Sequence, residues 1–441
     1  MDYINNYTKC NFKLKLPRAM GKLKESLSKK IPDWRYNYRQ LLDEKGDQVT
    51  STVTIEKAYS GMKGVKGMVC DTSSVTADAG LHVRGKHILD LVDLKPEEIL
   101  YLLLIGEEPD AEALLDLQKE LKGKSTVPDY VWDVLDSMPK DSHPMAMFNT
   151  AILSMQKESK FSEAYDLVIS KSDYWETTLE DGLNIIAKLP AIGAAIYRMR
   201  FNKGDRIEAG DSIDWSENFL QMMGFDYSDD MLKMMQLYLM LHCDHEGGNV
   251  STFSALTVNS ALSDPYYSLS AGLNGLAGPL HGLANQNNLK FVLDIIDHYK
   301  GVPSDEQLKE FSWDRLNSGK VIPGYGHAVL RCPDPRFTAF MDFGKEHIQN
   351  DDVFAIVKAL FDVVPPVLEE QGKAKNPWPN VDAASGSLLY YYGLKDFNYY
   401  TVLFSLSRAM GIVSQIVINR ALRIPITRPK SVTTEWLKNN I

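Results

Sequence analysis

The segment NYYTVLFSLSRAMGIVSQIV, residues 398–417, decides the fold. Its apolar residues recur at spacings of one, three and four, which is typical of a long amphipathic helix. A second segment, MLKMMQLYLML at 231–241, is apolar on nearly every face, and Ser228 is available as its N-cap. Strand patterns are confined to short pieces at 49–54 and 80–84. The sequence therefore predicts a mainly α protein with a small N-terminal β element.

Length and composition narrow the possible classes of protein. The chain has 441 residues, enough for one large domain and a smaller one, and a 44% hydrophobic share supplies a sizeable core. The net charge of -10 argues against a general nucleic-acid binder. Four scattered cysteines with no CxxC pair indicate a reducing compartment. No apolar run approaches membrane-spanning length, so no membrane partner is expected.

The N-terminal segment 1–28 bears on location. It is rich in lysine and lacks the apolar region of a secretory signal. It resembles a transit peptide only weakly, because arginine and serine are sparse near its start. We therefore expect the bacterial cytoplasm, with the mitochondrial matrix as the alternative.

Two stretches look like joints between domains. Residues 272–282 are dense in Gly and Ala, and residues 373–386 hold two prolines between helical patterns. We expect a large helical domain from residues 1–282 and 388–441, and a small mobile domain from 283–387, since hinges need only a few residues at element ends. Within the helical pattern at 183–200, Pro190 predicts a kink or break.

His281 lies in the glycine-flanked segment GPLHG. Pro279 can start a helix, which would place His281 in the first turn, where the helix dipole disfavours a charged imidazole. A neutral histidine can polarise a carbonyl by donating a hydrogen bond. The alternative is a helix-start histidine packed in the core.

His327 and Asp382 lie in two further segments of this kind. His327 follows the glycine loop PGYG, whose amides can face an anion or polar ligand. The pattern lacks the third glycine and the βαβ setting of a dinucleotide site. Asp382 follows two prolines and precedes a helical pattern, so a rigid approach could present it as a base; otherwise it is a turn or cap residue.

Arg408 stands inside the apolar C-terminal helix, where a buried guanidinium requires a partner. The partner is either a substrate carboxylate or a structural Asp or Glu. In the run HCDHEGGN, His242 and His245 are three residues apart, but the run is not HExxH, and we expect no metal site. We expect instead a helix that ends at Gly247-Gly248 and presents His245 to a ligand.

Together these motifs resemble one family, the citrate synthases of eukaryotic type. The segments in question are DHEGGNVSTF (244–253), GLNGLAGPLHGLANQ (272–286), VIPGYGHAVLRCPDPR (321–336), NPWPNVDAASG (376–386), NYYTVLFSLSRAMG (398–411) and RPKS (428–431). They stand in the family's order and spacing. The resemblance implies a nearly all-helical two-domain fold and a homodimer.

The resemblance also implies roles for single residues. His281 would donate to the thioester carbonyl of acetyl-CoA, Asp382 would deprotonate its methyl group, and His327 would donate to the ketone oxygen of oxaloacetate. The oxaloacetate carboxylates would be held by His245, Arg336, Arg408 and the partner subunit's Arg428. Coenzyme A would meet Pro323, Gly324, Tyr325, Gly326, Arg331, Lys373 and Lys375.

The implied activity is condensation of acetyl-CoA, oxaloacetate and water to citrate and CoA, with no tightly bound cofactor. Lys63 and Lys171 replace arginines that often face the CoA phosphates in this branch, and lysine binds phosphate without a bidentate fork. A 2-methylcitrate synthase using propionyl-CoA would need the same residues, because one methylene changes binding by only about 1–3 kcal/mol. A non-catalytic CoA- or carboxylate-binding protein is the third hypothesis.

Overall fold

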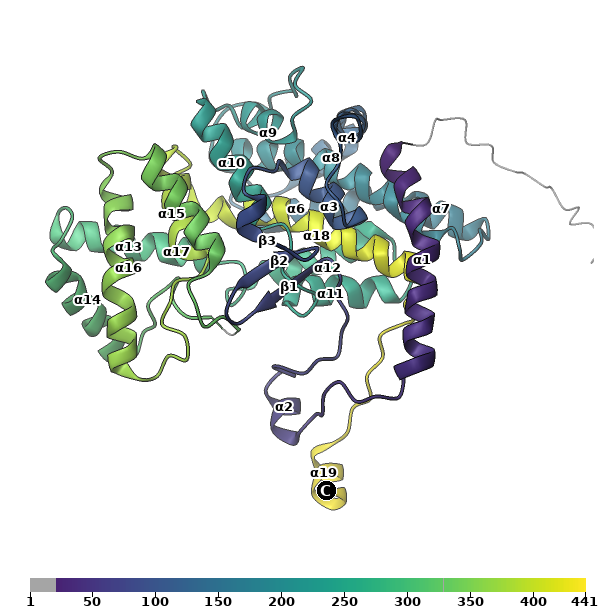
Figure 1. The fold of residues 1–441 in the computed structure, drawn as a ribbon. Helices are drawn as coiled ribbons and strands as arrows, with labels where there is room; N and C mark the ends of the chain where they lie inside the picture. The colour runs from purple at the N-terminus through teal and green to yellow at the C-terminus, as the bar shows by residue number, and fades with distance from the viewer. Residues whose placement is uncertain (1–20, 328) are drawn as a thin grey trace, which may run out of the picture.

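The computed structural model describes residues 21–327 and 329–441, so the expectation for the N-terminal segment lies largely outside the described residues. The predicted mainly helical fold is confirmed (Figure 1). The helices are α1 (Lys22–Lys45), α2 (Ile55–Tyr59), α3 (Pro96–Ile105), α4 (Ala111–Lys124), α5 (Asp129–Ser137), α6 (Pro144–Ser154), α7 (Lys160–Asp166), α8 (Tyr174–Arg200), α9 (Trp215–Met223), α10 (Asp229–Leu241), α11 (Val250–Ser260), α12 (Pro265–Leu276), α13 (Ala284–Tyr299), α14 (Asp305–Asn317), α15 (Pro335–His347), α16 (Asp352–Gln371), α17 (Asp382–Tyr391), α18 (Tyr400–Leu422) and α19 (Thr434–Asn440).

Helix α18 forms the centre of the core, as its apolar pattern predicts. It packs against α8, and a Cβ added at Gly182 would lie 2.5 Å from Cγ1 of Val413, so glycine permits this close approach. The segment Phe397–Leu422 is long and apolar enough to cross a membrane, contrary to our expectation from the sequence. However, 94% of its most apolar window is buried inside the protein, so it is a core helix.

The two other helix predictions had different outcomes. Helix α10 matches the predicted segment, and Oγ of Ser228 accepts a hydrogen bond from the Met231 N–H at 3.2 Å, as an N-cap does. The predicted break at Pro190 is wrong, because α8 runs through this residue without interruption. Pro190 and most of its neighbours along α8 are buried, and this packing outweighs the lost backbone hydrogen bond.

The β element is a three-stranded antiparallel sheet of β1 (Ser73–Thr76), β2 (Gly80–Val83) and β3 (Lys86–His87). Ser73 pairs with Val83 and Thr76 with Gly80. The strand predicted near 80–84 is confirmed, but the one at 49–54 is wrong: these residues form an irregular, largely exposed segment before α2. No strand of the described sheet lies beside them to complete a β ladder.

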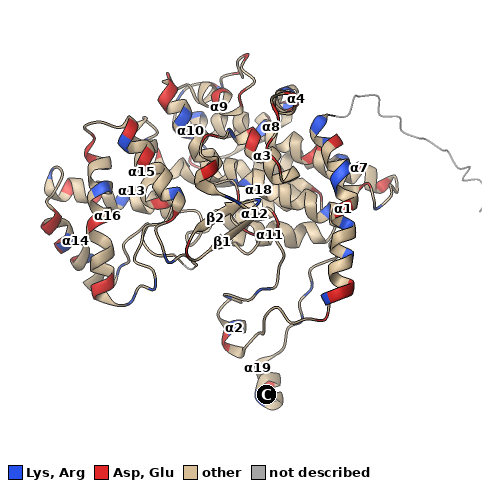
Figure 2. Cartoon of the chain, in the orientation of Figure 1, with Lys and Arg blue, Asp and Glu red and all other residues tan. Residues whose placement is uncertain are grey.

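The helices form two groups, and only the first of the two predicted joints lies between them. Figure 1 shows α13 to α17 together on one side and the helices around α18 on the other, with the sheet between them. The chain enters the first group at the turn 277–283 and returns to the second in the segment 392–399, between α17 and α18, whereas the loop 372–381 joins α16 to α17 within the first group. The division into residues 1–282 with 388–441 and 283–387 stays a prediction. Figure 2 shows Lys and Arg interspersed with Asp and Glu over the outer helices.

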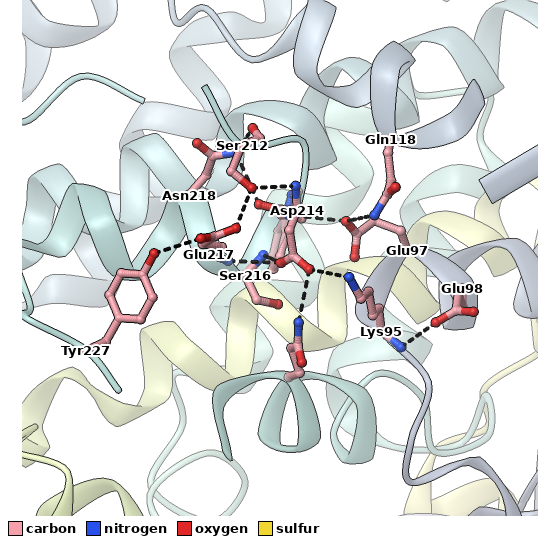
Figure 3. Close-up of polar contacts among 12 residues, drawn as sticks. Lys95, Glu97, Glu98, Gln118, Ser212, Asp214, Ser216, Glu217, Asn218 and Tyr227 are labelled. Atoms are coloured by element: carbon pink, nitrogen blue, oxygen red, sulfur yellow. Dashed lines mark hydrogen bonds and ion pairs between the residues drawn. The ribbon is translucent and has the colours of Figure 1, made fainter. Parts of the chain in front are cut away.

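A polar network outside the predicted site joins α3, α9 and α10 (Figure 3). Oδ1 of Asp214 caps α9 by accepting the N–H groups of Ser216 and Glu217, both at 3.0 Å, and Oδ2 lies 2.9 Å from Nζ of Lys95. Glu97 accepts the Trp215 N–H at 2.9 Å. Its second carboxylate oxygen is buried without a partner among the described residues, and burial raises the pKa of Glu97 to about 7.

Candidate active site

Two loops pair with each other and bring two predicted catalytic segments together. The Gly326 N–H donates to the Trp378 carbonyl at 3.0 Å, and the Asn380 N–H donates to the Gly324 carbonyl at 2.8 Å. Gly324 has a φ of +79°, and a Cβ there would lie 2.9 Å from Cα of Ala383. Glycine is therefore required by both conformation and space. The segment that carries His327 thus runs alongside the segment that leads into Asp382.

The tautomer of His327 follows from its hydrogen bonds. The N–H groups of Val329 and Leu330 both donate to Nδ1 of His327 at 3.0 Å. A backbone N–H can only donate, so Nδ1 is an acceptor and the ring proton of a neutral imidazole resides on Nε2. Burial, together with the charge of Arg336, lowers the pKa of His327. His327 is therefore a neutral ring whose Nε2–H is a hydrogen-bond donor.

His281 has the same property through a different contact. The Ser251 N–H, in the first turn of α11, donates to Nε2 of His281 at 3.3 Å, and the Ser251 hydroxyl lies 3.0 Å from the same nitrogen. The proton of the neutral ring is then on Nδ1. Burial, together with Arg408, lowers the pKa of His281 to about 4. The predicted neutral state is supported.

The predicted helix start at Pro279 is wrong. Helix α12 ends at Leu276 and α13 begins at Ala284, so His281 lies in the turn between them. A Cβ at Gly282 would lie 2.2 Å from the Leu276 carbonyl oxygen, which shows how tightly this turn closes. His281 instead faces the positive N-terminal end of α11, because the Ser251 N–H in the first turn of that helix donates to its ring.

Asp382 is the first residue of α17, and its own N–H donates to Oδ1 of Asn380 at 3.0 Å. Burial raises the pKa of Asp382 to about 6, against the opposing charge of Arg336. A carboxylate with this pKa is a stronger base than an ordinary aspartate and is still ionised near neutral pH.

Arg408 and Arg336 are both buried near these residues, with different partners. Nε of Arg408 donates to the His242 carbonyl at 3.1 Å, and its guanidinium lies 4.7 Å from the ring centroid of Phe404. No Asp or Glu in the described ranges forms an ion pair with Arg408. Arg336 instead makes a bidentate pair with Asp334, with N···O distances of 3.0 and 2.7 Å.

His245 joins the same group. Its ring centroid lies 5.9 Å from that of His327, and burial followed by the charge of Arg336 lowers its pKa well below the usual value. The helix before it ends at Leu241 rather than at Gly247-Gly248, so His245 lies in a loop. His242 is buried and stacks on Tyr238, with ring centroids 4.3 Å apart. Among the described residues, no cluster of three metal-ligating side chains occurs.

The remaining predicted residues lie at the periphery. Arg331 is exposed, and its guanidinium donates to the Val329 carbonyl at 2.9 Å. Lys373 and Lys375 are exposed in the loop after α16, while Pro323, Gly324, Tyr325 and Gly326 form the paired loop described above. Arg428 is exposed in the extended segment between α18 and α19, and the structure does not bring it to the other site residues.

Sequence reasoning missed the residues that hold the predicted ones. Ser251 fixes His281, and Oδ1 of Asn249 accepts from Ser251 Oγ at 2.7 Å and lies 3.5 Å from Nη1 of Arg408. Asp334 caps α15 and pairs with Arg336. Only Asp334 had a local signal, because an Asp before a Pro is typical of a helix start.

Comparison with known proteins shows the family of the chain. The family model "Citrate synthase, C-terminal domain" matches residues 61–430. The chain belongs to the citrate synthase family. The mitochondrial citrate synthase of Daucus carota is 45% identical over 95% of this chain and 90% of its own length. A probable mitochondrial citrate synthase of Glossina morsitans morsitans is 44% identical over 95% of this chain and 92% of its own.

Solved citrate synthase structures share the fold. The citrate synthase of Pyrobaculum aerophilum aligns with a TM-score of 0.77 and 28% identity, covering 88% of this chain and 95% of its own. The citrate synthase of Thermoplasma acidophilum aligns with a TM-score of 0.74, covering 87% and 97%, in a ternary complex with carboxymethyl coenzyme A and oxaloacetate. At 24% identity this second likeness concerns the fold alone. The relatives from Daucus carota and Glossina morsitans morsitans are named mitochondrial, which favours the second of the two locations we expected over the bacterial cytoplasm.

Proposed function

We propose that this member of the citrate synthase family condenses acetyl-CoA with oxaloacetate and water to give citrate and CoA. One observation carries the proposal. His281 and His327 each have one ring nitrogen occupied by a backbone N–H, which leaves each neutral ring with one hydrogen-bond donor. Asp382 supplies a carboxylate. It shares a charged neighbour with His281, because the charge of Arg408 acts on the pKa of both residues.

This set matches the chemical problem of the reaction. A thioester methyl is a very weak carbon acid, so a carboxylate can remove its proton only if the enolate is stabilised as it forms. We assign proton removal to Asp382 and stabilisation of the thioester oxygen to Nδ1–H of His281. A single positioned donor of this kind contributes roughly 2.7–4 kcal/mol in known enzymes.

His327 acts on the other substrate. Its Nε2–H donates to the ketone oxygen of oxaloacetate, which makes the ketone carbon electrophilic toward the methylene carbon of acetyl-CoA. The electron pair of the enolate forms the bond between these two carbons, and the resulting alkoxide oxygen receives the proton that Asp382 removed from the methyl group. Water then hydrolyses the citryl thioester, which releases citrate and CoA. The neutral state of His327 suits this role because a donor held as N–H gives polarisation without a full proton transfer.

The oxaloacetate carboxylates are assigned to the buried cations. Arg408 has no carboxylate partner in the described part of the chain, so a substrate carboxylate supplies its counter-charge. Arg336 presents its remaining N–H groups beside Asp334, and His245 adds a ring next to His327. We assign Arg428 to the site of a second copy in a homodimer, because its extended segment leaves the site of its own chain.

Coenzyme A is assigned to the paired loop and the basic residues near it. The 323–326 loop lies next to His327, and Arg331, Lys373 and Lys375 are exposed cations on the segments around it. Exposed cations are available to phosphate groups. Movement of residues 283–387 against the large domain would then close the site and exclude water before the thioester can be hydrolysed. We place the protein in the mitochondrial matrix, as the names of the relatives suggest.

The test is release of CoA thiol, followed with dithionitrobenzoate in the presence of both substrates. We expect oxaloacetate-dependent release from acetyl-CoA, and turnover with propionyl-CoA that is lower by about tenfold or more. No oxaloacetate-dependent signal would exclude the proposal. A preference for propionyl-CoA would instead assign the 2-methylcitrate reaction. Binding without product, measured by calorimetry, would point to the non-catalytic protein.

A further inference from the structure

The hairpin of β1 and β2 contacts the loop that carries His245. Oγ of Ser73 accepts the N–H of Glu246 at 2.7 Å and donates to Oδ2 of Asp244 at 2.9 Å. These two residues flank His245 directly in the chain. One hydroxyl on β1 therefore binds the backbone on one side of His245 and the side chain on the other.

The contact also holds an unusual backbone conformation. Glu246 has a φ of +60°, in the left-handed region that non-glycine residues rarely adopt, and its Oε1 accepts the Val75 N–H at 2.9 Å. Asp244 is 0% exposed and also accepts from Nε2 of Gln415 on α18 at 2.8 Å. The loop conformation thus depends on polar contacts with β1 and α18 together.

The opposite end of the hairpin contacts the segment between His327 and Arg336. The Arg331 N–H donates to the Ala77 carbonyl, in the β1–β2 turn, at 2.7 Å. A Cβ added at Gly80 would lie 2.5 Å from Cδ of Pro335, so the start of β2 packs directly on the start of α15. Figure 1 shows the sheet in this place, between α13–α17 and the helices around α18.

We infer that the β1–β2 hairpin is a positioning element and that Ser73 is a positioning residue for oxaloacetate binding. The hairpin fixes the His245 loop at one end and the 331–335 segment at the other, and so sets the 5.9 Å spacing of the His245 and His327 rings. Ser73 itself touches no substrate and acts through Asp244 and Glu246. This inference rests on the proposed function, because its readout is oxaloacetate kinetics.

The experiment compares single substitutions on β1 in the full-length protein. We expect Ser73→Ala to raise the KM for oxaloacetate about tenfold while the KM for acetyl-CoA stays within about twofold and kcat within about threefold. Ser73→Cys retains a weak donor and acceptor and should give an intermediate KM. The matched control is Ser74→Ala, because Ser74 is the next residue, is exposed and lies outside these contacts. It should behave like the unsubstituted protein.

A merely structural role would raise both KM values together or lower kcat alone, and either result would overturn the inference. So would a Ser73→Ala protein with unchanged KM for oxaloacetate. Thr72→Val offers a second route if Ser73→Ala does not fold, since it removes another hydroxyl that donates to Asp244 at little change in volume. It should raise the same KM by about threefold. Inactivity of the unsubstituted protein contradicts the proposed function and is thereby distinguished from failure of this inference.

Discussion

The backbone N–H of Ser251 donates to Nε2 of His281, so a residue on α11 determines which nitrogen of a histidine 30 positions away carries the proton. The amide belongs to the first turn of a helix and has no intrahelical partner to bind. Its use here satisfies the amide and orients the imidazole at once. The imidazole of His281 is therefore a donor of fixed orientation rather than a freely rotating ring.

His281→Ala tests the donor assigned to the thioester oxygen. We expect kcat to fall by about 10²–10³, the usual cost of losing one positioned donor, while the KM for oxaloacetate stays close to its original value. Circular dichroism and the melting temperature serve as the folding control. An unchanged kcat would remove His281 from the chemical step.

Asp382 should determine the acid side of the pH profile. Burial raises its pKa to about 6, and a base must be ionised to act, so kcat/KM should be half of its plateau value near pH 6 and fall further as the pH drops. Asp382→Asn should lower kcat by roughly 10²–10⁴ and abolish that dependence. The acid limb should not arise from His281, whose pKa of about 4 keeps it neutral over this range. A profile that is flat down to pH 5 would contradict the assignment.

Arg408→Lys tests the carboxylate anchor. Lysine keeps the charge but loses the planar fork, so contacts to the His242 carbonyl and to a substrate carboxylate cannot both be kept. A hydrogen bond to a charged group is worth about 1.5–3 kcal/mol, which corresponds to a KM for oxaloacetate raised by roughly ten- to a hundredfold. The KM for acetyl-CoA is the internal control. Equal effects on both substrates would indicate a structural ion instead.

Glu97→Gln should change the pH dependence of stability. Below about pH 4.5 the carboxyl group is protonated in both folded and unfolded chains, so its burial carries no charge penalty. Between pH 4.5 and about 7 the unfolded chain releases the proton while the folded chain keeps it, and stability falls by roughly 3 kcal/mol. Chemical unfolding of Glu97→Gln and of the unsubstituted protein measures the free energy of unfolding at both pH values. The loss of this free energy between pH 5 and pH 8 should be smaller in the variant.

Glu98→Gln is the matched control for the loss of one negative charge, because Glu98 is the next residue on α3 and accepts the Lys95 N–H in a capping box. It should leave the difference between pH 5 and pH 8 unchanged. An identical response of the two variants would show that Glu97 is not the titrating group.

The sequence predicted those parts of the fold that depend on local pattern. The helices at 231–241 and 402–417 formed because their apolar faces have a core to enter, and Ser228 caps the first of them as expected. The break at Pro190 and the strand at 49–54 were predicted wrongly, because in each case tertiary packing outweighs the local pattern. Burial holds α8 together across a proline, and the absence of a pairing strand leaves a strand-like pattern irregular.

The site was predictable in its residue types and less so in its geometry. The glycines around His327 indicated a close backbone approach, which the paired loops provide. The supports of His281 could not be predicted, because Ser251 reaches it only through the packing of α11 against the turn after α12. Likewise, Thr72 and Ser73 precede Asp244 by about 170 residues, and no local pattern connects them.

The buried guanidinium of Arg408 makes the stability of the protein depend on a bound ligand. No carboxylate of the described side chains forms a direct ion pair with Arg408, although the charges of Asp244 and Asp382 act on it, and a bound dianion adds a direct counter-charge only in the folded state. Ligand at a hundredfold excess over its Kd adds about 2.7 kcal/mol to folding. Resistance to proteases should accordingly follow the supply of oxaloacetate, so that idle copies are degraded first.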